Sequence, residues 1–130
     1  MTTIGHVESE FEEPAPPETM RGTRSTIVID EEYAPGLTGI EQRGRVTVLF
    51  EFHESEGFDL VAKRHRGTDR RGVFASRSPN RPTPIGVTTA KLIEREGRRL
   101  LVEGLDAIDG TPVLDIKPYS AEMDAAADLG

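Results

Sequence analysis

Three prolines separated by polar residues mark the stretch between Ser78 and Gly86. Each proline fixes its own φ angle and biases the preceding residue toward extended geometry, which disfavours a helix there. A proline also cannot donate a hydrogen bond to a central sheet ladder. The stretch is therefore predicted to be a stiff connection between strands.

The same region carries Arg71, Arg77 and Arg81. Arginines on a stiff loop lose little conformational freedom when they bind an anion, so this pattern is typical of a phosphate or carboxylate site. A proline-rich surface connection with solvated arginines fits the same residues equally well.

The rest of the chain contains short apolar runs separated by turn residues. In residues 45–53, one face carries Val46, Val48, Phe50 and Phe52 and the other carries Thr47, Leu49, Glu51 and His53, the period of a half-buried strand. Glu96-Gly97 predicts a hairpin turn between two strands. The predicted strands are residues 3–8, 25–29, 45–53, 58–62, 72–76, 87–94, 99–102 and 113–117. With 130 residues and no convincing amphipathic helix, we expect one all-β domain, a small β-barrel with long loops and little or no helix.

Composition excludes several classes of protein. The chain has no cysteine, and His6, His53 and His65 show no ligand spacing, so no metal site is expected. No apolar run approaches the roughly 20 residues of a membrane span, and no leader precedes the first predicted strand, so we expect a soluble, cytoplasmic protein. A G-x-G turn, a P-loop and a nucleophile elbow are absent from the sequence.

Charge is distributed unevenly along the chain. Residues 63–81 carry 7 basic and 1 acidic side chains, although the whole chain has a net charge of −7. Such a segment can bind a polyanion locally, though with little long-range steering. A solvated run of charges is the alternative interpretation.

Four motifs, in order, resemble those of the TsaA-like (TrmO) family. They are Ile4-Gly-His-Val-Glu-Ser9, Val48-Leu-Phe-Glu-Phe-His53, Gly72-Val-Phe-Ala-Ser-Arg-Ser-Pro-Asn-Arg-Pro-Thr-Pro-Ile-Gly86 and Asp109-Gly-Thr-Pro-Val-Leu-Asp-Ile-Lys-Pro-Tyr119. The resemblance covers roughly residues 3 to 124. It implies a β-barrel domain over residues 1–124 and a flexible tail over residues 125–130. Thr83 departs from the pattern, which usually has Asn there, and it lacks the paired donor and acceptor of an amide.

The resemblance also implies S-adenosyl-L-methionine as cofactor. The positions that match the family's cofactor contacts are Pro17, Glu18, His53, Glu54, Arg77, Ser78, Arg81, Gly86, Asp109, Gly110, Thr111 and Pro112. Arg77 or Arg81 is suited to hold the methionine carboxylate. Asp109 or Glu54 is suited to pair with ribose hydroxyls or the ammonium group. A plain type I′ hairpin turn accounts for Asp109-Gly110 equally well.

The activity implied by the resemblance is methylation of N6 of threonylcarbamoyladenosine beside the anticodon of tRNA, by a homodimer. That nitrogen is poorly nucleophilic, so a base is expected to help. His53, Asp115 and Tyr119 are the candidates, and the sequence does not choose among them.

The alternative hypothesis is a non-catalytic barrel that binds the cofactor or a nucleotide in a regulatory or accessory role. Two features favour it. One is the acidity outside residues 63–81. The other is the end of the chain soon after Tyr119, where the better-known bacterial members continue into another domain.

Overall fold

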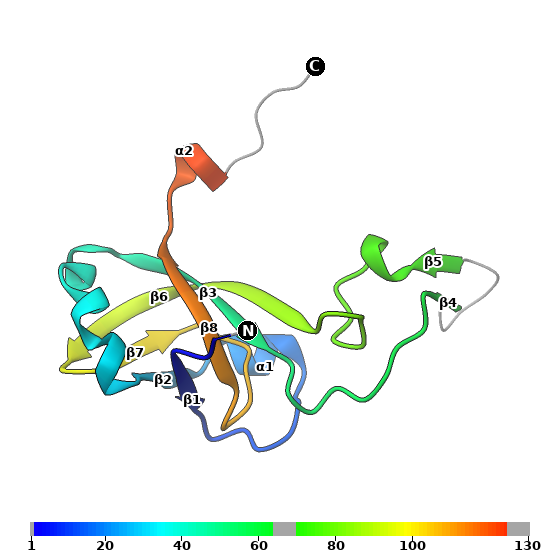
Figure 1. Cartoon of the computed structure of the whole chain (residues 1–130), viewed down its shortest axis with the longest axis horizontal. Coiled ribbons are helices and arrows are strands. Elements are labelled where there is room, and N and C mark those ends of the chain that lie inside the picture. Colours follow the sequence, from blue (N-terminus) through cyan, green and yellow to red (C-terminus); the bar gives the residue numbers. More distant parts are fainter. Residues whose placement is uncertain (1, 64–69, 125–130) are drawn as a thin grey trace.

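The protein folds into a closed antiparallel barrel of six strands, with a separate two-stranded arm (Figure 1). The computed structural model describes residues 2–63 and 70–124. In chain order the elements are β1 (Gly5–Glu8), α1 (Pro17–Arg21), β2 (Arg24–Ile29), the 3₁₀ helices η1 (Glu31–Leu37) and η2 (Ile40–Gln42), β3 (Arg45–Glu51), β4 (Val61–Lys63), β5 (Arg70–Gly72), the 3₁₀ helix η3 (Val73–Ala75), β6 (Ile85–Glu96), β7 (Arg99–Glu103), β8 (Pro112–Pro118) and α2 (Ala121–Asp124). The all-β class is confirmed, and the helical turns lie in the connections.

The barrel follows the order β1-β2-β7-β6-β3-β8 and closes where β8 pairs with β1. β3 is central to the side that carries the site, because it pairs along its length with β6 and β8. A bulge interrupts its ladder with β8, where Leu49 faces Asp115 but Phe50 faces Val113. Bulges bend a strand and re-aim the residues beyond it.

Alternation along the strands builds the core. In β3, Val46, Val48 and Phe50 are buried and the residues between them are half-buried, as the period of two predicts. They pack with buried side chains of β2 and β7, among them Ile27 and Leu100. The barrel interior is therefore filled by branched aliphatic side chains, and ligands must bind outside it.

The predicted strand over residues 72–76 is wrong. β5 ends at Gly72, and Val73–Ala75 forms η3, in which Val73 is buried and Phe74 is exposed. The backbone N–H and the hydroxyl of Ser76 both donate to the carbonyl oxygen of Val73, which closes this tight turn.

Two further boundaries differ from prediction. The strand expected over residues 58–62 begins only at Val61, and pairs with β5 rather than with the barrel. Ala121–Asp124, where no helix was expected, forms one helical turn in which the Ser120 N–H donates to the Asp124 carboxylate. Residues 64–69, within the basic segment 63–81, and the predicted tail 125–130 lie outside the described residues.

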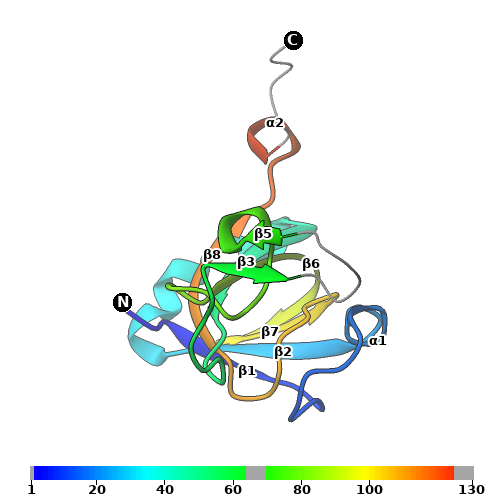
Figure 2. The same cartoon turned by 90° about the vertical axis from the view of Figure 1, so that its right-hand side faces the viewer.

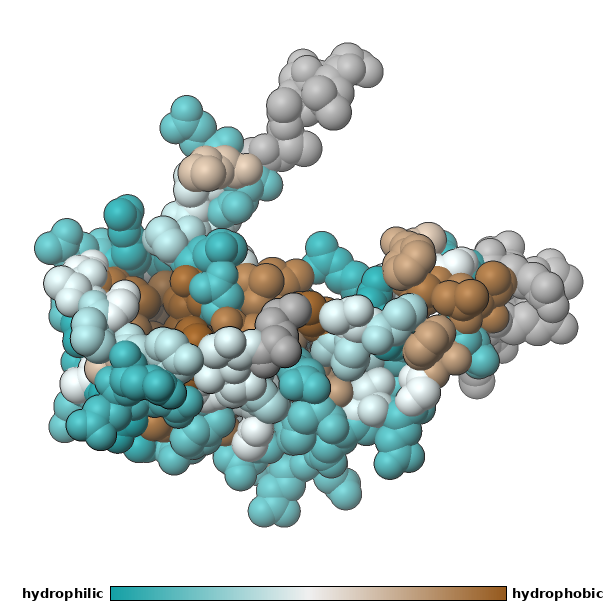
Figure 3. Space-filling model, in the orientation of Figure 1, coloured by the Kyte–Doolittle hydropathy of each residue, from teal (hydrophilic) through white to brown (hydrophobic). Residues whose placement is uncertain are grey.

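β4, β5 and η3 form an arm that extends away from the barrel (Figure 1), and in the view turned by 90° the arm lies in front of the barrel (Figure 2). Its surface carries exposed apolar side chains, with Leu60 at 60% and Phe74 at 80% exposure. The space-filling view shows this apolar surface at the end of the molecule (Figure 3).

The part of the chain that the structure describes contains neither a membrane-spanning helix nor a cluster of metal-ligating side chains. None of the helices there is long and apolar enough to cross a membrane. No group of three or more His, Cys, Asp or Glu side chains within the described ranges is arranged to hold a metal ion.

The close pairing of β1 with β2 requires a residue without a side chain at position 5. A Cβ on Gly5 would lie 2.2 Å from the carbonyl oxygen of Val28, a backbone atom that cannot rotate away. We predict that Gly5→Ala lowers the free energy of unfolding by about 1–3 kcal/mol or more, the cost of overpacking. Urea denaturation followed by circular dichroism measures this. Gly44→Ala is the control, because nothing lies within 4 Å of a Cβ there. Equal effects of the two changes would contradict the prediction.

Candidate functional site

The arginine–proline loop, residues 76–84, is tied to the barrel at several points. Phe52 N–H donates to the Pro84 carbonyl at 2.8 Å, at the entry to β6. The Ser55 hydroxyl lies 2.9 Å from both the Pro79 carbonyl oxygen and Asn80 Oδ1. Asn80 N–H also donates to the Ser78 hydroxyl within the loop. The predicted stiff connection therefore owes its shape to these bonds as well as to its prolines.

Arg81 crosses the inside of this loop. Its Nη1 donates to the carbonyl oxygens of Ser76 at 2.9 Å and Ser78 at 3.2 Å. Arg77 is exposed, and the described residues offer it no hydrogen bond or ion pair. The two arginines that the sequence could not separate thus differ: Arg81 holds the loop, and Arg77 is available to a ligand.

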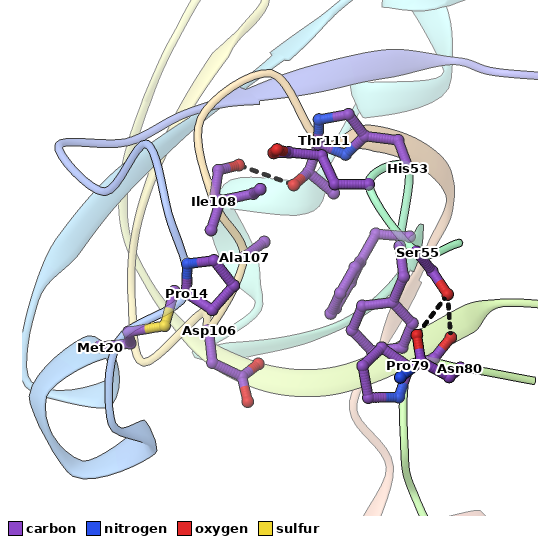
Figure 4. A pocket seen from close by; sticks show the side chains of 13 residues that line it. Pro14, Met20, His53, Ser55, Pro79, Asn80, Asp106, Ala107, Ile108 and Thr111 are labelled. Carbon is purple, nitrogen blue, oxygen red and sulfur yellow. Dashed lines mark hydrogen bonds between the residues drawn. The ribbon is translucent and has the colours of Figure 1, made fainter. Parts of the chain in front are cut away.

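An apolar cavity of about 300 Å³ lies between this loop, the end of β3 and the segment before β8 (Figure 4). Met20 of α1 and Pro14 form one side of it, and Ile108 lies on the same side in the close-up view. Pro79 and Asn80 of the loop form the opposite side. A slot of this size and composition suits a flat, weakly polar ring.

A second, more polar cavity of about 560 Å³ adjoins the first. It is lined by Arg21, Arg77 and Arg81, together with Thr88 and the exposed Phe74 of the arm. Arg21 and Arg77 also line a shallower pocket beside it. Three guanidinium groups give this cavity the chemistry of a carboxylate or phosphate site.

The two cavities share three lining residues: Phe50, Phe52 and Asp106. The two rings meet edge to face, with centroids 5.4 Å apart and planes at 76°. They fit because β6 has Gly86 opposite Phe50, where a Cβ would lie 2.6 Å from the Phe50 ring and 2.8 Å from the Phe52 ring. Gly86 thus lines the polar cavity and leaves room for these two rings.

The turn before β8 lies beside His53. Thr111 N–H donates to the Ile108 carbonyl at 3.2 Å, and Gly110 has φ of +82°. No described residue other than glycine has a positive φ, so the turn has the φ pattern of type II and the type I′ alternative is wrong. A Cβ on Gly110 would lie 3.9 Å from His53 Nε2.

Six of the twelve predicted cofactor residues line the cavities. His53, Glu54 and Thr111 line the apolar one. Arg77, Arg81 and Gly86 line the polar one.

The other predicted residues lie nearby in different roles. Asp109 accepts a hydrogen bond from Ser9 N–H at 3.0 Å, which fixes the chain after β1. Ser78 bonds within its loop. Of the described lining residues, none is Glu18, Ser78, Asp109, Gly110 or Pro112. Pro17 belongs to α1, and its side chain is outside what the structure describes. The segment before β2 reaches the cavities through Pro14, Met20 and Arg21 instead.

The three candidate bases are also separated by the fold. His53 lines the apolar cavity. Asp115 lies on β8 and pairs with Lys117 at 2.8 Å, and this hydrogen bond raises the pKa of Lys117. Tyr119 follows β8, where its N–H bonds the Arg45 carbonyl at the opposite end of β3 from His53. Neither Asp115 nor Tyr119 is among the described residues that line the two cavities.

Asp106 lines both cavities but was not predicted from the sequence. It lies between Leu105 and Ala107, which are buried, and its own side chain is 25% exposed. The available signal was a single carboxylate in an otherwise apolar run just before a turn. Met20 and Asn80 were missed because their positions depend on how two loops fold back.

A known protein family matches the chain over a range that contains all the barrel strands. The family model of the tRNA-methyltransferase O N-terminal domain matches residues 4–125. The chain belongs to the TrmO family. The resemblance drawn from the four sequence motifs is thereby confirmed.

Two relatives and one crystal structure align with most or all of the chain. A probable S-adenosyl-L-methionine-binding protein of Pyrococcus abyssi is 35% identical, over 93% of this chain and 68% of its own. The tRNA (adenine(37)-N6)-methyltransferase of Mus musculus is 39% identical, over 97% of this chain and 32% of its own. The crystal structure of TrmO from Pseudomonas aeruginosa superposes with a TM-score of 0.76 at 36% identity, covering all of this chain and 62% of that one. The chain thus spans about a third of the mouse relative and less than two thirds of the solved TrmO chain.

The different roles of the two loop arginines can be tested. We predict that Arg81→Ala loosens residues 76–84, because it removes two charge-assisted bonds. For a half-buried donor their loss amounts to about 1–3 kcal/mol of local stability. Hydrogen-exchange mass spectrometry of peptides from this loop measures it. Arg77→Ala is the matched control and leaves exchange unchanged. Equal acceleration in both variants would contradict the assignment.

Proposed function

We propose that this chain is an S-adenosyl-L-methionine-dependent methyltransferase that acts on N6 of threonylcarbamoyladenosine in tRNA, next to the anticodon. The main support for the proposal is that six residues at family-matched positions line two adjoining cavities, of which one is apolar and the other is rich in arginine. The relatives named as S-adenosyl-L-methionine-binding proteins and as a tRNA methyltransferase support the same activity.

The residues present fit this cofactor. Both cavity volumes, about 300 and 560 Å³, fall in the usual range for small-molecule sites. The apolar cavity offers Met20, Pro79 and Ile108 to the faces of the adenine ring. The polar cavity offers Arg77 to the carboxylate of the methionine end. Glu54, at the rim of the apolar cavity, is placed to accept hydrogen bonds from ribose hydroxyls.

When bound, the cofactor supplies an electrophilic methyl group, and the protein contributes mainly position. The ordered loop and the Phe50–Phe52 pair give the site a fixed shape before any ligand enters. His53 is the base candidate that lines a cavity, so we assign it the role of accepting or sharing the N6 proton. Arg77 and Arg81, near the end of the basic segment 63–81, line the polar cavity, and we assign this segment the contact with tRNA phosphates. Arg64 and Arg66 of that segment lie outside the described residues.

The proposed activity has a direct test. The protein is incubated with isotopically labelled S-adenosyl-L-methionine and tRNA that carries threonylcarbamoyladenosine, at low and at high salt, and the nucleosides are analysed by mass spectrometry. We expect label in N6-methylated threonylcarbamoyladenosine and none in tRNA that lacks the modification. Cofactor binding without methyl transfer at either salt concentration would instead favour a non-catalytic binding module.

We also propose that residues 1–124 form the functional barrel domain and that the protein acts as a homodimer in the cytoplasm. The exposed apolar arm supports the dimer, because Phe58, Leu60, Val61 and Phe74 lie on or beside it. Phe74 also lines the polar cavity, so a second copy seated on the arm would close that side of the site.

The dimer proposal predicts the effect of one substitution. Phe74→Ser removes the most exposed aromatic side chain of the arm and is expected to shift the protein from dimer to monomer at micromolar concentration. Multi-angle light scattering measures the mass. Met123→Ser is the control, because Met123 is 85% exposed but lies on α2, away from the arm. A parent protein that is monomeric and binds one cofactor per chain would remove the proposal.

A further inference from the structure

Asp106 stands where the apolar and polar cavities meet. It is the carboxylate common to both sets of described lining residues, and it faces the same space as the Phe50–Phe52 pair. The close-up view shows its carboxylate between the Pro14 and Met20 side of the apolar cavity and the Pro79 and Asn80 side (Figure 4).

Two groups lie beside the Asp106 carboxylate. The Thr88 hydroxyl, from β6, donates to Oδ1 at 2.5 Å. Arg21 Nη2, from α1, lies 3.9 Å from Oδ2, beyond hydrogen-bond reach, and the Arg21 side chain is 65% exposed. One carboxylate oxygen is thus fixed by a neutral donor, and the other is only loosely compensated. A partly buried carboxylate in this state is suited to a further cation.

The aromatic rings add a second attraction for positive charge. Phe50 is buried at 2% exposure and packs edge to face on Phe52, so the pair is held rigidly against β6. The π-face of an aromatic ring attracts cations, most strongly those that are weakly hydrated. Asp106, Phe50 and Phe52 line both cavities, so a cation at the junction would lie among a carboxylate and two aromatic rings.

We propose that this junction is the subsite for the sulfonium cation of S-adenosyl-L-methionine, with Asp106 as its charge partner. The inference rests on the proposed function for the identity of the ligand. In that molecule the adenosine and the amino acid are joined at the sulfonium. If the two ends occupy the two adjoining cavities, the sulfonium lies at the junction whichever end takes which cavity.

This assignment predicts that the site binds the methyl donor and its product with different affinities. S-adenosyl-L-homocysteine has the same two ends and the same ammonium group but a neutral sulfur. The Asp106 charge therefore favours the donor over the product. If Asp106 paired with the ammonium instead, it would favour both ligands equally.

Isothermal titration of the whole chain, without tRNA, tests the proposal with three ligands: S-adenosyl-L-methionine, its unreactive cationic analogue sinefungin and S-adenosyl-L-homocysteine. The readout is the ratio of donor to product affinity in each variant. Asp106→Asn keeps the acceptor for Thr88 and removes the charge, so we expect about a tenfold loss for the two cationic ligands, the scale of one charge contact in a partly exposed site. Binding of the neutral product is expected to be unchanged.

Two further variants keep the test decisive. Arg21→Gln removes the competing cation from an exposed position and is expected to raise the ratio, even if Asp106→Asn does not fold. Glu103→Gln removes an acid that pairs with Arg24 outside both cavities, and is expected to leave the ratio unchanged. A ratio that stays constant in Asp106→Asn and Arg21→Gln overturns the sulfonium subsite while the proposed function stands. If the parent binds none of the three ligands, the proposed function falls and this inference with it.

Discussion

The close approach of β6 to the rings of Phe50 and Phe52 is the contact on which the site depends. Position 86 has no side chain, so the two rings occupy space that a Cβ would claim. The rings then separate an apolar cavity from a polar one and form part of the wall of each. A larger residue at position 86 would push the rings into one cavity or the other, and both compartments would change together.

The candidate site also requires that the arginine–proline loop be ordered. The prolines restrict the backbone, and hydrogen bonds from Arg81, Phe52 and Ser55 fix the loop on the barrel. Because this ordering is complete before a ligand binds, less conformational entropy is lost on binding. Arg77 then stands on a rigid segment with its guanidinium free of any partner recorded within the described ranges, which suits recognition of a planar carboxylate.

The sequence predicted the barrel well wherever one face of a strand is buried. The alternation of β3 and the hairpin at Glu96-Gly97 follow directly from side-chain period and turn chemistry. The segment Val73–Ala75 was predicted wrongly as part of a strand because its residues are mostly apolar. Ser76 instead closes a 3₁₀ turn through local hydrogen bonds to Val73, and such bonds leave no periodic pattern in the sequence.

The site was predicted in part, for a physical reason. The sequence motifs correctly picked out His53, Arg77 and Gly86 as residues that line the cavities. They could not distinguish Arg77 from Arg81, because two arginines differ only in the groups that surround them in the fold. Asp106 acquires its position from the fold of two loops and from Thr88 on another strand. Such contacts between distant segments are not encoded in local pattern.

The bulge between β3 and β8 has a consequence for how this architecture tolerates change. Leu49 faces Asp115 and Phe50 faces Val113, so Leu114 is an extra residue with no partner across the ladder. The bulge bends β8 just after the turn that carries Gly110 and Thr111, where a Cβ on Gly110 would lie 3.9 Å from His53 Nε2. The site therefore depends on the length of the chain at this point more than on the identity of the side chain. Substitutions at position 114 leave the backbone path intact, whereas loss of a single residue there would re-register the strand and carry the turn away from the cavities.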